Sequence, residues 1–386
     1  MRDNRLRPQI ETSTVFSLAL VMGLSQLGSL NALEQTKNNS FWKKWVGEEL
    51  PSADTIGRVF SVISCSEIRQ ILKVLYSRLK RNKVLRPAIG NKFALIIDGH
   101  ESSCSYLRSC NKCLKRVIHT AQGDQVQYYH RNVLAMLWCE GFYLPLDIEP
   151  QYPGEDEVSC AMRLLKRVMA EYPRAFDLIL VDGLYVRASF FKLVIKHGKH
   201  VIAVLKDERR DLLKDAQGLF KTEKSTRYHH GRTERECWDI EDFSSWSQVG
   251  RKVRVVRSLE TKHLRRQNTG KIHYETTEWV WVSTITKKAL LTEDFVKLGH
   301  GRWKIENNGF NELVNYWHAD HVYRHSPVAI EAFWLLTSIA YILFHAFIGR
   351  NLKPEIRGKY SKLHWARIIT AELFRGTTDI KALFPP

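Results

Sequence analysis

Two aspartates stand at the ends of two apolar runs in this chain of 386 residues. Asp98 follows residues 93–97 (FALII), Asp182 follows residues 176–181 (FDLILV), and each aspartate is followed by glycine. A short continuous apolar run is typical of a strand buried on both faces of a sheet. If the two strands are neighbours, their ends lie about 4.8 Å apart, and both carboxylates can hold one divalent ion.

A third carboxylate is available later in the chain, in residues 302–307 (RWKIEN). Arg302 and Glu306 are four residues apart and share one face of a helix, so the guanidinium can orient the carboxylate or bind a phosphate. Three carboxylates can hold a pair of divalent ions, which is the arrangement that phosphoryl transfer on DNA uses. The competing acids for the three positions are Glu312, Glu101 and Asp156.

The elements that must position these acids follow an α/β order. Strand-like runs and stretches of helical spacing alternate between residues 93 and 205, and a β-rich insertion without helical period follows. Helical spacing precedes this region from Val15 and returns after it at Leu290. We therefore expect a helical N-terminal domain, a first part of the catalytic domain, a β-rich insertion, and a helical completion, at residues 1–90, 91–221, 222–287 and 288–386.

The net charge indicates the class of partner. Lys and Arg number 59 against 41 Asp and Glu, which gives a net charge of +18. Such an excess predicts a polyanionic partner, with nucleic acid ahead of an anionic membrane surface. Two apolar stretches, 15–33 and 329–348, carry polar residues, and we expect both to be buried helices rather than membrane spans. The expected protein is intracellular and has no membrane partner.

The seven cysteines include one pair with metal-ligand spacing. An odd count at irregular spacing predicts reduced thiols rather than a disulfide framework. Cys110 and Cys113 form a Cys-x2-Cys pair with Cys104 close by in sequence, and such a pair can supply half of a tetrahedral zinc site. No second pair follows, so a polar turn is the alternative interpretation.

Taken together, these motifs resemble those of bacterial insertion-sequence transposases with a DDE triad, in the branch with a β-rich insertion before the glutamate. The resemblance covers most of the chain. It rests on residues 52–60 (SADTIGRVF), 96–99 (IIDG), 153–157 (PGEDE), 180–185 (LVDGLY), 204–209 (VLKDER) and 300–307 (HGRWKIEN).

The resemblance implies an α/β, ribonuclease-H-like fold: a mixed five-stranded sheet flanked by helices, with the β-rich insertion and an N-terminal helical domain that binds DNA ends. It implies Asp98, Asp182 and Glu306 as catalytic residues and as ligands of two Mg²⁺ or Mn²⁺ ions. The implied activity is cleavage at the terminal inverted repeats of an insertion sequence and transfer of the 3′-OH ends into target DNA. A homodimer on DNA, in the cytoplasm at the bacterial nucleoid, is the expected setting.

The sequence departs from one signature of that superfamily, Tyr-x2-Arg-x3-Glu-x6-Lys. Arg302 and Glu306 match it, whereas Gly299 stands at the tyrosine position and Leu313 at the lysine position. The role of the family's lysine then falls to Lys304 or Lys206. The DNA-binding candidates are Arg302, Trp303, Lys304, Lys206, Arg209 and Arg210. The alternative for the tryptophan is core packing, and the alternative for Lys206, Arg209 and Arg210 is a solvated helix start.

Two other functions remain open from the sequence. One is an inactive or domesticated derivative that binds DNA, and the other is a metal-dependent, structure-specific nuclease that does not join strands. The presence of all three acids favours an active transposase over the inactive derivative.

Overall fold

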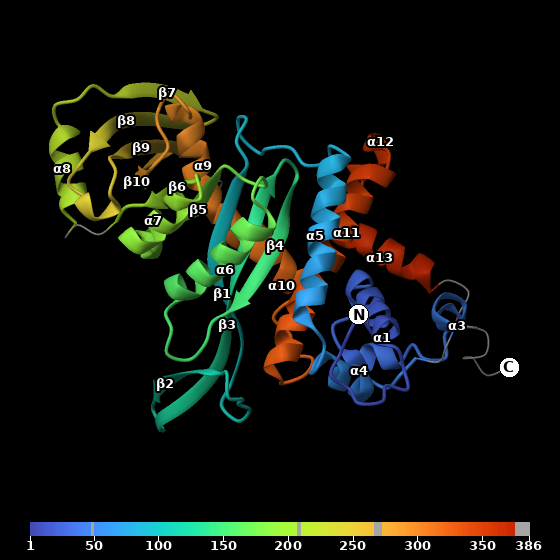
Figure 1. The fold of residues 1–386 in the computed structure, drawn as a ribbon. Helices are drawn as coiled ribbons and strands as arrows, with labels where there is room; N and C mark the ends of the chain where they lie inside the picture. The colour runs from blue at the N-terminus through green and yellow to red at the C-terminus, as the bar shows by residue number, and fades with distance from the viewer. Residues whose placement is uncertain (48–49, 207–209, 266–271, 375–386) are drawn as a thin grey trace.

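The computed structural model describes residues 1–47, 50–206, 210–265 and 272–374. One long sheet crosses the molecule, with the strands of the insertion at one end and the N-terminal helices on the other side (Figure 1).

Five strands in the order β4-β3-β1-β5-β6 form the centre of the sheet. Strand β1 pairs antiparallel with β3, which pairs antiparallel with β4, whereas β5 and β6 run parallel to β1. The apolar runs in β1 and β5 are buried on both faces, which is why they form central strands. The predicted mixed α/β sheet is therefore confirmed. The strands are β1 (Ala94–Ser105), β3 (Gly123–Cys139), β4 (Phe142–Pro150), β5 (Leu178–Val181) and β6 (His200–Val204).

The β-rich insertion continues this sheet instead of forming a separate layer. Strand β10 pairs antiparallel with β6, with Trp281 opposite Val204, and the other insertion strands follow in the order β9-β8-β7. With these four strands and strand β2, described below, the sheet has ten strands within the described residues and is wider than the five strands predicted. The insertion strands are β7 (Thr226–His230), β8 (Thr233–Phe243), β9 (Val253–Arg265) and β10 (Ile272–Ser283).

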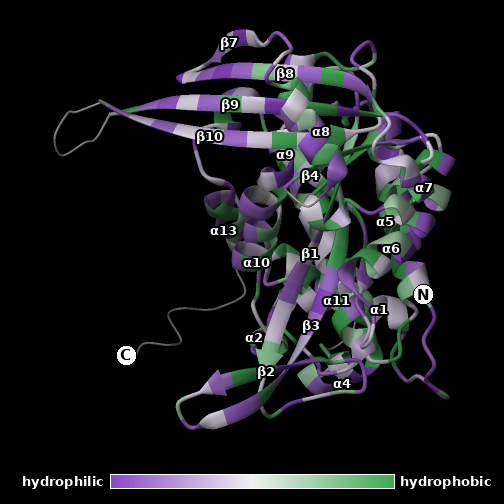
Figure 2. Cartoon of the chain, turned by 90° about the vertical axis from the view of Figure 1, so that its left-hand side faces the viewer, coloured by the Kyte–Doolittle hydropathy of each residue, from purple (hydrophilic) through white to green (hydrophobic). Residues whose placement is uncertain are grey.

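A projecting arm is the second addition to the predicted sheet. Strand β2 (Leu114–Thr120) pairs with β3, and β1 pairs with β3 as far as Ser105, beyond the part of β3 that β4 covers. We call residues 99–131 the β1–β3 arm; it extends away from the body of the molecule at the bottom of Figure 2. Strand β2 (LKRVIHT) is largely exposed and mixes polar and apolar residues, so it lacks the apolar run that marks a central strand.

Helices cover both faces of the central strands. Helices α6 and α7 lie in front of these strands in Figure 1, and α9 and α10 lie behind them. A π-helical turn, η3 (Ile305–Phe310), separates α9 from α10. The helices that follow the first strands are α6 (Glu157–Glu171), α7 (Ala188–Lys196), α8 (Asp211–Leu219), α9 (Thr292–Lys304), α10 (Asn311–Trp317), α11 (Pro327–Asn351), α12 (Pro354–Arg357) and α13 (Lys362–Leu373).

The N-terminal helices pack against the C-terminal part of the chain. Helix α11 contacts α1, α4 and α5 as well as strand β4. Helix α11 is long and apolar enough to cross a membrane, but 78% of its apolar window is buried inside the protein. The second apolar stretch is thus a core helix, as predicted, whereas the first is divided between α1 and α2, which both carry buried apolar residues. The N-terminal helices are α1 (Thr12–Leu24), α2 (Leu30–Glu34), α3 (Ser40–Val46), α4 (Ala53–Phe60) and α5 (Cys65–Arg81).

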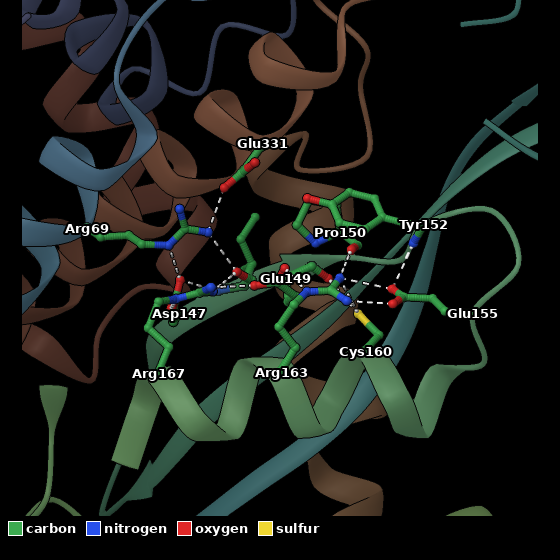
Figure 3. Close-up of polar contacts among 11 residues, drawn as sticks. Arg69, Asp147, Glu149, Pro150, Tyr152, Glu155, Cys160, Arg163, Arg167 and Glu331 are labelled. Carbon is green, nitrogen blue, oxygen red and sulfur yellow. Dashed lines mark hydrogen bonds and ion pairs between the residues drawn. The ribbon is translucent and has the colours of Figure 1, made fainter. Parts of the chain in front are cut away.

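A network of ion pairs joins α5, β4, α6 and α11 (Figure 3). The side chain of Asp147 on β4 is only 3% exposed and accepts hydrogen bonds from Arg69 Nε at 2.8 Å and Arg167 Nε at 2.5 Å. Buried charges are tolerated only when they are paired and hydrogen-bonded, so the network fixes how α6 lies on the sheet. Its members are Arg69, Asp147, Glu149, Glu155, Arg163, Arg167 and Glu331.

Helix α9 passes so close to the sheet that two of its residues must be glycine. A Cβ atom at Gly301 would lie 1.9 Å from the Trp138 ring, and one at Gly299 would lie 2.6 Å from the Trp281 ring. We expect Gly301→Ala to lower the free energy of unfolding by about 3 kcal/mol, because a close-packed contact has no room for a methyl group. Urea unfolding followed by circular dichroism measures this loss.

The matched control is Gly218→Ala in α8, where a Cβ atom would meet nothing within 4 Å. It should raise stability by about 0.5–1 kcal/mol, since alanine favours a helix over glycine. Equal stability of Gly301→Ala and the wild type would contradict the close contact between α9 and the sheet.

Candidate active site

Asp98 and Asp182 lie side by side on neighbouring parallel strands. Ile96 of β1 stands opposite Leu180 of β5, so the two aspartates, each two residues further on, are in register. Neighbouring strands are about 4.8 Å apart, which brings the two carboxylates to one edge of the sheet. The condition on which the sequence argument rested, that these strands are neighbours, is therefore met.

The local backbone differs at the two positions. Asp182 follows the last residue of β5 and accepts a hydrogen bond from the backbone N–H of Leu184 at 2.8 Å, which fixes a tight turn. Asp98 lies within β1, not at its end as predicted, because β3 continues to pair with this strand beyond it.

Glu306 reaches the same place from a helical segment that packs against β1. It lies in the π-helical turn after α9, and π-turns inside helices are frequent at functional sites. Asp98, Asp182, Arg302 and Glu306 all line one cavity of about 650 Å³. We call this cavity the acidic cleft.

Arg302 pairs with a different acid from the one predicted. Its Nη1 lies 3.0 Å from Oδ2 of Asp98, and both side chains are largely buried. The expectation that Arg302 orients Glu306 was based on their spacing along a regular helix. The π-turn begins between the two residues and changes that spacing.

The acidic cleft suits a divalent cation. Burial raises the pKa of Asp98 to about 7; Arg302 opposes this rise, while Asp182, Glu157 and Glu306 add to it. One arginine therefore does not balance the surrounding carboxylates. Carboxylate oxygens are the ligands that Mg²⁺ and Mn²⁺ prefer, so the donor set fits such an ion.

Glu157 is an acid near the cleft that was not among the candidate metal ligands predicted from the sequence. Its Oε1 accepts a hydrogen bond from the hydroxyl of buried Tyr185 at 2.8 Å, and its Oε2 lies 3.5 Å from Nη1 of Arg131. A Cβ atom at residue 99 would lie 2.4 Å from Glu157 Oε2, so Gly99 is needed for this approach. The acidic segment 153–157 contained the signal, but spacing did not distinguish its members.

The competing acids have other partners. Asp156 caps α6 by accepting from Ser159 N at 2.8 Å and pairs with Arg187. Glu101 lines the cleft but forms a two-fold hydrogen-bonded pair with Arg116. Glu312 lines a different cavity, where it contacts His345 and Lys362.

Of the predicted DNA-binding residues that the structure describes, Arg302 lines the acidic cleft and the others lie outside its lining. Trp303 stacks edge-on against Trp279 and contacts the Arg302 guanidinium, and the amino group of Lys206 lies 5.7 Å from the centre of the same Trp279 ring. Lys304 is exposed over the Trp138 ring. Arg210 lies at the start of α8, beside a separate cavity, and Arg209 falls outside the described residues.

Of the three cysteines predicted as possible zinc ligands, Cys104 lies apart from Cys110 and Cys113. Cys104 is exposed on β1, whereas the sulfurs of Cys110 and Cys113 are 3.6 Å apart and lie beside two histidines distant in sequence.

The pKa of Asp98 predicts a pH dependence of stability. Between about pH 4 and 7 the folded protein keeps a proton on Asp98 that the unfolded chain has released, because the pKa of Asp98 is raised in the folded state. Asp98 therefore stabilises the fold at low pH, and this contribution is lost as pH rises through about 7. In metal-free buffer, Asp98→Asn should gain stability over the wild type as pH rises from about 5 to 7, by at most about 1.4 kcal/mol per pH unit. Urea unfolding at several pH values measures the gain, and a pH-independent difference would contradict it.

Comparison with known proteins finds a transposase domain in this chain. Residues 156–343 match the model of the transposase DDE domain, a segment that contains Asp182 and Glu306. No curated protein matches the chain. One similar solved structure is a cryo-EM structure of the piggyBac transposase synaptic complex with hairpin DNA, at 11% identity and a TM-score of 0.46, with 100% of this chain and 75% of that chain covered. The family match bears out the resemblance inferred from the motifs: residues 156–343, just under half of this chain, match the transposase DDE domain.

Proposed function

We propose that this transposase cuts DNA at the terminal inverted repeats of an insertion sequence and joins the 3′-OH ends to target DNA. DDE transposases use divalent metal ions. The observation that carries the proposal is that Asp98, Asp182 and Glu306, from three distant segments, line a single cleft.

In this proposal the three carboxylates hold two Mg²⁺ or Mn²⁺ ions. When bound, such ions activate the attacking oxygen and stabilise the leaving oxygen of the phosphodiester. Asp98 and Asp182 supply ligands from the sheet, and Glu306 supplies one from the π-helical turn. Arg302, at the wall of the same cleft, is suited to bind the scissile phosphate.

The remaining basic candidates are proposed to bind the DNA on either side of the cleft. Lys304, Lys206 and Arg210 supply charge for phosphates, Arg209 is proposed from the sequence alone, and Trp303 supplies an aromatic ring for a base. The net charge of +18 supports a nucleic-acid partner.

The larger assembly is also a proposal. Residues 1–90 bind the element ends, residues 91–221 and 288–386 form the catalytic domain, and residues 222–287 form its insertion. Two copies of the chain hold the two ends together on DNA, at the nucleoid of a bacterial cytoplasm.

A cleavage and joining assay tests the proposal. The probe is a labelled duplex that carries the inverted repeats flanking the reading frame, incubated with the purified protein and Mg²⁺ or with EDTA. Metal-dependent cleavage at the repeat ends together with joined product supports the proposal. Cleavage without joining would favour the nuclease, and end binding without cleavage would favour an inactive derivative.

A further inference from the structure

Four metal-ligating side chains meet at the base of the β1–β3 arm, outside the acidic cleft. Cys110 and Cys113 lie in the connection between β1 and β2, His130 lies on β3, and His325 lies just before α11. One ligand atom of each, namely the two sulfurs and a nitrogen of each imidazole, lies within 4.8 Å of the other three. Cys113 and His130 are buried, so this is not a chance cluster on an exposed surface.

The distances match a tetrahedral zinc site. Zinc bonds of about 2.3 Å to sulfur and 2.05 Å to nitrogen require sulfur atoms about 3.8 Å apart and sulfur–nitrogen separations of about 3.6 Å. Here Cys110 Sγ and Cys113 Sγ are 3.6 Å apart, and His130 Nε2 lies 3.5 and 3.3 Å from them. His325 Nε2 lies 3.6 Å from Cys113 Sγ.

The local backbone also suits a metal-bound thiolate. The N–H of Cys110 donates to Sγ of Cys113 at 3.1 Å, and the N–H of Cys113 donates to the carbonyl of Cys110 at 3.1 Å. This tight turn directs both sulfurs to the same point. The sulfur separation is well above the bond length of a disulfide, about 2.05 Å.

We propose that Cys110, Cys113, His130 and His325 bind one structural zinc ion. Two cysteines and two histidines fill the four positions of a tetrahedral site and leave none open for substrate, which is typical of structural rather than catalytic zinc. The ion joins the β1–β3 arm to the segment before α11, so that two segments as much as 212 residues apart in the sequence are held at one point.

The arm held in this way is basic and aromatic. Arg116 lies 4.7 Å from the ring centre of Tyr129, and Lys115 lies 5.6 Å from that of Tyr128. At the base of the arm, His100 stacks on Phe310 of the π-turn that carries Glu306. The base of the arm therefore lies next to the acidic cleft, and the zinc ion joins it to the segment before α11.

Metal analysis of the full-length protein tests the proposal. Purified with zinc and a reducing agent, the wild type should contain about one zinc per chain by mass spectrometry of the metal. Cys113→Ser and His325→Asn should each lose most of it. The matched control is Cys104→Ser, which removes an exposed cysteine outside the group and should keep the full zinc content.

Cobalt spectroscopy provides a second measurement that does not depend on a folded variant. Wild-type protein reconstituted with Co²⁺ should show a sulfur-to-metal charge-transfer band and the visible absorption of tetrahedral cobalt. Asp182→Asn should keep both, which separates this site from the acidic cleft. Folded wild type without bound zinc or a cobalt–sulfur band, full zinc in His325→Asn, or a Cys110–Cys113 disulfide under these conditions would each overturn the proposal.

Discussion

Asp182→Asn is expected to lower cleavage at the element ends by at least about 1000-fold, because it removes a charged ligand of the proposed metal site. Asp98→Asn and Glu306→Gln should show losses of the same size, since the three carboxylates act as one unit. Binding to the same DNA should stay within about threefold of the wild type, because the phosphate contacts come from basic residues elsewhere. Gel assays of cleavage and of binding on one labelled duplex measure both quantities.

Glu312→Gln is the matched control for Glu306→Gln. Glu312 lies six residues further on and contacts His345 and Lys362 instead of lining the acidic cleft. Its variant should keep cleavage within an order of magnitude of the wild type. Full activity of Glu306→Gln together with an inactive Glu312→Gln would transfer the role to the second glutamate.

Asp147→Asn is expected to lower the free energy of unfolding by about 3 kcal/mol, because it weakens two charged hydrogen bonds from partly buried arginines to one buried carboxylate, each worth about 1.5–3 kcal/mol. Arg69 and Arg167 both donate to this side chain, and they come from α5 and α6 (Figure 3). The loss can be measured by urea unfolding at neutral pH.

The control pair for this prediction links the same two helices at the surface. Lys73 of α5 lies 2.6 Å from Glu171 of α6, and both side chains are about two-fifths exposed. Glu171→Gln should cost less than about 1 kcal/mol, since water screens exposed ion pairs. Similar losses from the two variants would mean that burial does not set the strength of this network.

The central strands could be predicted because burial on both faces requires continuous apolar residues. That pattern located β1 and β5 and, with them, Asp98 and Asp182. Strand β2 could not be found in this way, because one strand on an exposed arm needs no apolar run. The widening of the sheet was also missed, since composition shows that residues 222–287 are β-rich but not which strand they pair with.

The residues of the candidate site also fall into two groups, those that the sequence determined and those that only the tertiary structure revealed. The sequence by itself determined the three acids, the arginine and the Cys-x2-Cys pair, since each depends on residue type and on neighbours a few positions away. Only the tertiary structure decided that Arg302 pairs with Asp98, that Glu157 approaches the cleft at Gly99, and that His130 and His325 complete the cysteine pair. The separations of these partners, up to 212 residues along the chain, carry no pattern, because folding rather than local spacing brings them together.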